Sequence, residues 1–306
     1  MGRMRPILVV GSLNMDLVVH VQRHPRPGDT VLGSDTQLFL GGKGANQAVA
    51  AAKAGGQVRM MGRVGNDVYS PQLISNLSDA GVDTGYVTEY DGPSGIAYIT
   101  VSEDGENTIV VSSGANRRLQ PEDLEASAFE NAAALLMQLE SPLETVLSAA
   151  QKANRLSLPI ILNAAPAQDL PPELLQIVNY LIVNEGEAED LSGVPVEDSE
   201  TALSAAQALR GKGLSNVIVT LGAAGVVWLG EEGPGKQPAF EVEVIDTTAA
   251  GDAFCGAFAV KIVEGTSLPE AVRFASAAGA LAATREGAQP SLPARTSIEA
   301  LLATSA

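Results

Sequence analysis

The sequence predicts an α/β protein: a doubly wound, mostly parallel sheet with helices on both faces and a small β-sheet lid. Three observations support this class. Apolar runs of strand length recur along the chain, Ala-rich segments of helical length separate them, and two regions interrupt the alternation with hairpin-like patterns. Buried strands that alternate with helices are typical of a parallel sheet, and right-handed crossovers put helices on both of its faces.

Five apolar runs are predicted strands of the main sheet: Ile7–Val10, Leu135–Leu139, Ile160–Leu162, Tyr180–Val183 and Val217–Leu221. The predicted helices between them are 44–55, 71–80, 142–155, 171–179 and 199–212. Phe240–Ile245 alternates apolar and polar residues as a strand does, and a buried helix is predicted directly after it. Because ligands bind beyond the carboxyl ends of such strands, polar residues at those ends are candidate site residues.

Residues 16–40 and 95–112 interrupt the alternation, and each reads as a β-hairpin. We expect them to form one small sheet that projects from a single α/β domain spanning residues 1–306. This sheet can act as a lid over the site, as a dimerisation ribbon without a part in substrate binding, or as both. Because a small sheet standing alone leaves an apolar face and open edges, we expect a homodimer formed through it.

The composition narrows the possible partners and location. The chain has 306 residues, and its net charge of −17 argues against nucleic acid as a partner. ATP stays possible, because a local anion site and Mg²⁺ outweigh a distant net charge. The single cysteine, Cys255, excludes an internal disulfide and suits a reducing compartment. No apolar run reaches the roughly 18 residues of a membrane helix, and no export signal is recognisable, so a cytoplasmic protein without a membrane partner is expected.

The most informative segment is 246–252. Ala249, Ala250 and Gly251 lie where the predicted strand becomes a helix, and their small side chains leave backbone N–H groups open to an anion. Asp252 adds a carboxylate at the same point. Phosphoryl transfer explains both features, because the N–H groups can hold the developing charge while Asp252 accepts the proton of an attacking hydroxyl. The alternative is that Asp252 caps a core helix and the small residues serve close packing.

Three further motifs end or begin predicted elements. Gly41–Asn46 is a glycine cluster before a helix; it departs from the P-loop pattern, and either a small polar ligand or a tight turn explains it. Asn14 and Asp16 point the same way on an extended segment, which suits neighbouring hydroxyls or a solvated turn. Asn184 and Glu187 offer oxygen ligands for Mg²⁺, or form a helix N-cap.

Taken together, these motifs describe a small-molecule kinase, and the chain resembles the ribokinase family of carbohydrate kinases over essentially its whole length. Gly41-Gly-Lys-Gly-Ala-Asn-Gln-Ala48 and Asp246-Thr-Thr-Ala-Ala-Gly-Asp-Ala-Phe254 match its two signatures. The resemblance implies transfer of phosphate from ATP to the 5-hydroxyl of D-ribose, with Mg²⁺ or another divalent cation required and K⁺ as activator. Kinases for fructose, deoxyribose or adenosine are the sibling alternatives, and a non-catalytic sugar or nucleotide sensor is the alternative from another class.

The resemblance also implies roles for single residues. It makes Asp252 the base and puts the anion hole at Ala249, Ala250 and Gly251. It implies sugar contacts from Asn14, Asp16, Gly42, Lys43, Asn46, Ile96, Glu140 and Asp252. It implies nucleotide contacts from Asn184, Glu187, Thr220, Gly222, Gly225 and Ser276. It implies a K⁺ site formed by Asp246, Thr248, Ala282, Arg285, Gly287 and Ser291. Family members often carry Asn where Ser276 stands, so its contact with the nucleotide is expected to differ.

Overall fold

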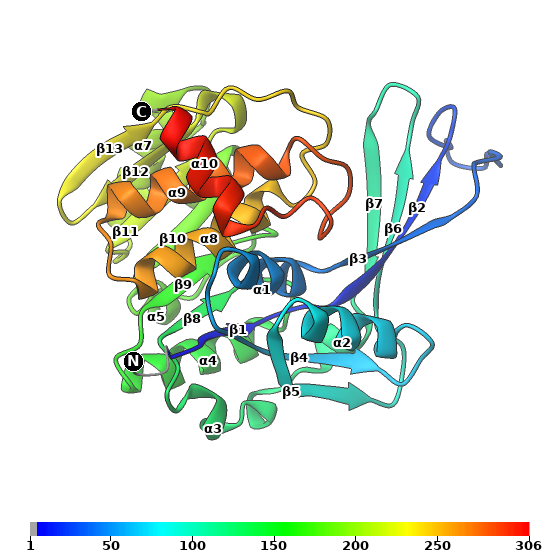
Figure 1. Ribbon diagram of the computed structural model, residues 1–306, viewed down its shortest axis with the longest axis horizontal. Coiled ribbons are helices and arrows are strands. Elements are labelled where there is room, and N and C mark those ends of the chain that lie inside the picture. The colour runs from blue at the N-terminus through cyan, green and yellow to red at the C-terminus, as the bar shows by residue number, and fades with distance from the viewer. Residues whose placement is uncertain (1–4, 306) are drawn as a thin grey trace.

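The computed structural model describes residues 5–305 and contains two β-sheets (Figure 1). The strands of the larger sheet are β1 (Ile7–Val10), β4 (Val58–Gly65), β5 (Val82–Tyr90), β8 (Ala134–Met137), β9 (Ile160–Asn163), β10 (Tyr180–Asn184), β11 (Asn216–Thr220), β12 (Val226–Gly230) and β13 (Gly233–Gln237). Their order is β13-β12-β11-β10-β9-β8-β1-β4-β5. All pairs from β5 to β11 are parallel, and the pairs β11–β12 and β12–β13 are antiparallel, so only β12 runs against the other strands.

Ten helices belong to the described chain: α1 (Lys43–Lys53), α2 (Ser70–Asp79), α3 (Ala126–Phe129), α4 (Leu143–Arg155), α5 (Pro172–Leu175), α6 (Glu185–Ser192), α7 (Ser199–Arg210), α8 (Ala250–Val263), α9 (Leu268–Ala282) and α10 (Arg295–Thr304). They form two apolar cores, one on each face of the sheet. Ile7 and Val9 of β1 belong to the core under α1, α8 and α9, whereas Leu8 and Val10 belong to the core under α4 and α7. The prediction of a doubly wound, mostly parallel sheet is therefore confirmed.

The smaller sheet consists of β2 (Asn14–His20), β3 (Gln37–Gly41), β6 (Gly95–Val101) and β7 (Asn107–Ser112), in the order β3-β2-β6-β7. The pairs β2–β3 and β6–β7 are antiparallel, as expected for two hairpins, and β2 joins them by pairing in parallel with β6. Figure 1 shows this sheet standing away from the larger one, beyond α1 and α2. That residues 1–306 form a single domain stays a prediction.

Two expectations about elements are wrong. Phe240–Ile245 is not a strand: within residues 5–305 no strand pairs with it, and Val244 and Ile245 are exposed. Alternation predicts a strand only where an edge is free to pair with it, and here Ile245 N–H donates instead to the carbonyl of Ala283 (2.8 Å). The predicted helix 171–179 shortens to the four residues of α5.

Four strands were missed, namely β4, β5, β12 and β13. β4 carries Arg59 and Arg63 between apolar residues, so it contains no unbroken apolar run. Both guanidinium groups donate to a backbone carbonyl oxygen and to a carboxylate. Arg59 binds Asp83, and Arg63 binds Asp123. β5 and β13 are edge strands that are only partly buried, so their sequences lack the apolar signal of the centre of the sheet.

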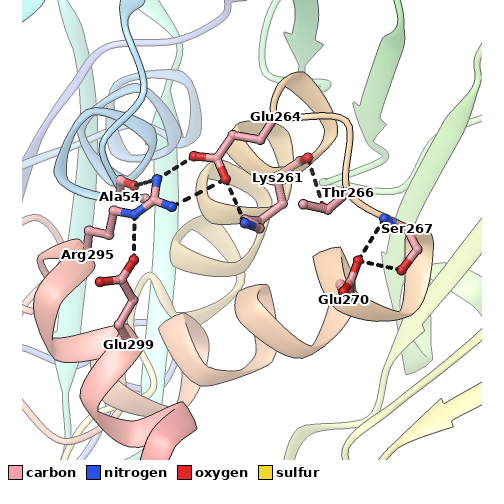
Figure 2. Close-up of polar contacts among 8 residues, drawn as sticks. All are labelled: Ala54, Lys261, Glu264, Thr266, Ser267, Glu270, Arg295 and Glu299. Atoms are coloured by element: carbon pink, nitrogen blue, oxygen red, sulfur yellow. Dashed lines mark hydrogen bonds and ion pairs between the residues drawn. The ribbon is translucent and has the colours of Figure 1, made fainter.

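The C-terminal helix is tied to the end of α8 by an ion-pair network (Figure 2). Arg295, the first residue of α10, binds both carboxylate oxygens of Glu264 and also Glu299 (2.8 Å). Lys261 Nζ donates to the same Glu264 (2.6 Å). Single surface ion pairs contribute only about 0–1 kcal/mol, but this network also fixes the helix whose other end carries Asp252. No helix within residues 5–305 is long and apolar enough to cross a membrane.

Candidate active site

Asp252 lies in the first turn of α8, where the carboxyl ends of the parallel strands meet α1. It is buried, and each carboxylate oxygen accepts one amide hydrogen bond: from Asn46 Nδ2 (2.9 Å) and from Gln47 Nε2 (2.9 Å). Burial raises the pKa of the Asp252 carboxyl above its ordinary value, although Lys43 and these two amides oppose the rise. The arrangement is a desolvated carboxylate, oriented by two donors, at the positive end of a helix.

Glycines allow α1 to begin directly against the end of β1. Gly42 has a φ of 87°, and a Cβ there would lie 2.7 Å from the backbone nitrogen of Asn14. Glu140, which follows β8, holds the same turn: its Oε2 accepts from Ser12 Oγ and from the Lys43 N–H (3.1 Å). Part of the Glu140 carboxylate is therefore used to fix the glycine turn and not left free for a ligand.

Asn14 and Asp16 open β2 beside this turn. Asn116 Nδ2 donates to Asn14 Oδ1 (2.7 Å), which leaves the Asn14 amide nitrogen as a donor for a ligand. Asp16 accepts no hydrogen bond from the rest of residues 5–305, and its carboxylate lies where a side chain at Gly41 would stand. Burial, together with the charges of Glu140 and Asp252, raises the pKa of Asp16 to about 7. Sequence reasoning missed Asn116, whose position about 100 residues from Asn14 gives no local signal.

Lys43 lies among these carboxylates. Burial by itself would lower the pKa of Lys43, but the charges of Asp252 and Glu140 reverse the direction and raise it. The ammonium group therefore stays protonated and offsets part of the negative charge gathered at the site.

The strand register decides which residues of the smaller sheet share a face with Asp16. Ala97 pairs with Asp16, and Ile99 lies two residues further along β6. Ile96 pairs with Met15, so the alternation of side chains puts it on the other face. The register thus favours Ala97 and Ile99 over Ile96 for contact with a ligand held by Asp16.

The turn before α8 leaves backbone donors open. Ala249 has a left-handed φ of 60°, which is uncommon for a residue other than glycine. Within the described chain the N–H groups of Gly251 and Asp252 find no acceptor, whereas that of Ala250 donates to the carbonyl of Thr247 (3.1 Å). A Cβ at Gly251 would meet nothing within 4 Å, so the helix end faces open space. Two of these N–H groups are therefore free to bind an anion.

The segment 246–248 contacts the turn that follows α9. Thr248 N–H (2.8 Å) and Thr248 Oγ1 (2.6 Å) donate to Asp246 Oδ1, and Gly287 N–H donates to Asp246 Oδ2 (2.8 Å). Although burial opposes it, these hydrogen bonds lower the pKa of Asp246. Ser291 Oγ is turned elsewhere, toward the carbonyl of Ala288 (2.7 Å). In contrast, the carbonyl oxygens of Arg285 and Gly287 accept no hydrogen bond within residues 5–305.

Asn184 and Glu187 form a reciprocal capping box at the start of α6: Glu187 N–H donates to Asn184 Oδ1 (2.8 Å), and Asn184 N–H donates to Glu187 Oε2 (2.9 Å). The N-cap alternative for this pair therefore holds in the structure. Burial raises the pKa of Glu187, partly offset by the Asn184 hydrogen bond and by Lys43. In the part of the chain that the structure describes, the other carboxylate oxygen of Glu187, Oε1, accepts no hydrogen bond and can bind a ligand.

Three of the remaining predicted nucleotide residues, Thr220, Gly222 and Gly225, lie at the end of β11 or directly after it. Thr220 Oγ1 donates to the carbonyl of Val183 (3.3 Å). Gly222 and Gly225 both have positive φ, and at Gly225 a side chain would clash with the backbone of Gln237 at 2.2 Å. On α9, the buried Ser276 hydroxyl has no hydrogen-bond partner in the described chain.

An oriented carboxylate beside an open helix N-terminus, at the carboxyl ends of parallel strands, is the arrangement expected of a small-molecule kinase, and comparison with known proteins agrees. The model of the pfkB family of carbohydrate kinases matches residues 4–295. The chain belongs to this family and is a carbohydrate kinase.

Individual relatives are similar over nearly their whole length. The chain is 41% identical to a ribokinase of Haemophilus influenzae over 295 residues, 95% of this chain and 96% of the relative. It is 37% identical to a deoxyribokinase of Salmonella typhimurium over 291 residues, 94% and 95% of the two chains. The structure of Arabidopsis thaliana ribokinase complexed with ribose and ATP superposes with a TM-score of 0.92 at 36% identity, covering 98% and 99% of the two chains.

Proposed function

We propose that this protein is an ATP-dependent ribokinase, which transfers the γ-phosphoryl group of ATP to the 5-hydroxyl of D-ribose. The observation that carries the proposal is the Asp252 carboxylate, oriented by Asn46 and Gln47 beside the open N–H groups of α8. Similarity to the ribokinase of Haemophilus influenzae and to the ribose and ATP complex from Arabidopsis supports ribose and ATP as substrates.

In this proposal Asp252 accepts the proton of the attacking hydroxyl, and the open N–H groups of Gly251 and Asp252 hold the charge that develops on the phosphoryl group. The Ala250 N–H of the predicted anion hole at 249–251 would first have to leave the carbonyl of Thr247. Asn14 and Asp16 bind sugar hydroxyls as donor and acceptor, and Asn46 adds its unpartnered Oδ1. Further sugar contacts are assigned to Gly42, Lys43, Glu140 and a β6 residue, for which the register favours Ile99 over the predicted Ile96. Catalysis then consists mainly of positioning and charge stabilisation.

The nucleotide is assigned to the end of β11, with contacts from Thr220, Gly222, Gly225 and Ser276. A divalent cation, Mg²⁺ or a substitute, fits the free oxygen of Glu187, since Mg²⁺ sites combine one or two protein carboxylates with substrate phosphates. When bound, the ion would neutralise phosphate charge; Asn184 fixes Glu187 through the capping box. Because the reaction needs ATP, we assign the protein to the cytoplasm.

The test is an ATP-coupled assay with D-ribose, deoxyribose, fructose and adenosine measured side by side. The proposal expects the highest kcat/KM for ribose, and the product should carry its phosphate on the 5-oxygen by NMR. A clear preference for deoxyribose is the second candidate outcome, and the deoxyribokinase relative is the observation that favours including it. Absence of turnover with every sugar, together with tight binding of one, would indicate a sensor.

A monovalent cation is proposed at the loop between Asp246 and the turn after α9. The site would combine Asp246 and Thr248 with backbone oxygens of Ala282, Arg285 and Gly287 and the hydroxyl of Ser291. The unpaired carbonyls of Arg285 and Gly287, beside the Asp246 carboxylate, fit a hard cation such as K⁺.

We expect kcat to rise when K⁺ replaces Na⁺ at equal ionic strength, because the bound ion would fix the loop that orients the open N–H groups at the start of α8. The gain should be blunted in Asp246→Ala. Steady-state kinetics at saturating Mg–ATP measure both effects. Equal kcat in the two salts would contradict the cation site and would mean that Asp246 only caps the loop.

A homodimer through the smaller sheet is also proposed. Leu38, Tyr98 and Val110 are 51%, 49% and 65% exposed, and the register aligns them across one face together with Leu17. Such a face is usually covered in natural proteins.

We expect Val110→Glu to convert the dimer into a monomer of 31.5 kDa, as measured by light scattering at micromolar concentration. Leu156→Glu is the matched control, since Leu156 is 49% exposed at the end of α4 on the main body, and it should leave the dimer intact. A wild-type protein that is monomeric at this concentration would contradict the proposal.

A further inference from the structure

Gln47 joins Asp252 to a buried chain of side-chain amides. Gln47 and Gln138 are fully buried, and Asn163 is 9% exposed. Gln47 Nε2 donates to Asp252 Oδ1 (2.9 Å) and to Asn163 Oδ1 (3.0 Å), while Gln47 Oε1 accepts from Gln138 Nε2 (2.6 Å). This chain of hydrogen-bonded amides connects α1, β9, α8 and the residue that follows β8.

A backbone carbonyl sets the direction of every amide in this chain. Asn163 Nδ2 donates to the carbonyl oxygen of Ile182 in β10 (3.2 Å), which also accepts from Ala164 N–H (3.0 Å) and can only accept. Asn163 must therefore turn its Oδ1 toward Gln47, and Gln47 must turn its Nε2 toward both Asn163 and Asp252. Reversing Gln47 would place its oxygen against two other oxygens, so Asp252 always faces a donor.

From this geometry we infer that Gln47 is a positioning residue, which holds Asp252 as an ionised proton acceptor of fixed orientation. A donor stabilises the carboxylate form against the protonated form, and the buried surroundings of Asp252 make that stabilisation necessary. The inference rests on the proposed function for its catalytic meaning, although the hydrogen-bond chain itself does not. Gln47 touches no proposed substrate atom and acts only through Asp252.

Other charged groups also act on Asp252 and must stay constant in a test. Lys43 favours its ionised form, whereas Glu140 disfavours it. Asp16, Glu187 and Cys255 titrate under the influence of Asp252 as well. None of these charged groups hydrogen-bonds to Gln47 in the described chain, so Gln47→Met leaves them in place; besides the donor to Asp252, it removes only the hydrogen bonds with Asn163 and Gln138.

The informative variants are Gln47→Met, which keeps the length and removes the donor, and Gln47→Glu, which replaces the donor with a second carboxylate. The loss of one hydrogen bond to a charged acceptor raises the pKa of that acceptor, here Asp252, by about one to two pH units. We expect the acidic limb of the kcat–pH profile to move to higher pH by that amount in Gln47→Met, and to still higher pH in Gln47→Glu. The KM for ATP should stay near the wild-type value.

If Gln47 had only a structural role, its replacement would lower Tm without shifting the acidic limb of the kcat–pH profile. Thr145→Val is the matched control, because Thr145 is fully buried and its hydroxyl donates to the carbonyl of Leu119 (2.7 Å) away from the site. It should lower Tm and leave the limb in place. An acidic limb of Gln47→Met that coincides with the wild-type limb would overturn the inference.

A second measurement separates this inference from the proposed function. The ¹³C carboxyl resonance of Asp252, assigned by its loss in Asp252→Asn, can be titrated in the protein without substrate. Its midpoint should lie higher in Gln47→Met than in wild type even if the wild-type enzyme phosphorylates no sugar tested. A wild-type enzyme without kinase activity would refute the proposed function, whereas unchanged midpoints would refute the role of Gln47.

Discussion

Replacing Asp252 with Asn should lower kcat by about 10²–10⁴-fold, the usual contribution of a general base. The amide cannot accept the proton of the sugar hydroxyl but keeps the shape of the side chain. Its nitrogen would face one of the two donors that now hold the carboxylate. Asn46 can accommodate this change by rotating its amide, because its buried Oδ1 has no hydrogen-bond partner among residues 5–305.

Binding of ribose and ATP to Asp252→Asn should stay near the wild-type level, as measured by calorimetry, while single-turnover kinetics report the chemical step. The melting temperature provides the control for folding. A variant that keeps most of the wild-type kcat would remove Asp252 from the role of base, and the reaction would then need another proton acceptor.

Replacing Asp16 with Ala should chiefly weaken ribose binding. Hydrogen bonds to a charged acceptor contribute about 1.5–3 kcal/mol each, so the loss of one such bond lowers affinity by at least about tenfold. Nucleotide affinity should change little, because Asp16 lies on β2 of the smaller sheet, whereas the proposed nucleotide residues follow β11 of the larger sheet. Calorimetric titration with ribose and with ATP separates the two effects.

The pH dependence of ribose binding gives an independent check on Asp16. Its pKa is raised to about 7, so the carboxyl is largely protonated below that pH and ionised above it. The ionised form accepts stronger, charge-assisted hydrogen bonds from hydroxyls than the protonated form does, so ribose affinity should increase as the pH rises from 6 to 8. In Asp16→Ala this increase should disappear. An unchanged ribose affinity in the variant would show that Asp16 does not bind the sugar, as the alternative of a solvated turn implies.

Local patterns in the sequence were sufficient for most of the fold. The apolar runs at Ile7–Val10 and Tyr180–Val183 became central parallel strands because a strand buried on both faces has no alternative to apolar side chains. The small residues before Asp252 likewise marked the start of α8. Phe240–Ile245 failed as a prediction because alternation describes one strand and contains no information about a partner.

At the site, too, some features follow from the sequence and others only from the tertiary structure. The sequence by itself determined the fold class, the kinase family and the residues that begin α1 and α8, since signatures and helix starts are local features. Only the tertiary structure decided that Gln47 and Asn116 orient Asp252 and Asn14, and that Ile99 shares a face with Asp16. Contacts such as the one from Asn46 to Asp252 join residues 206 positions apart, and packing alone brings such residues together.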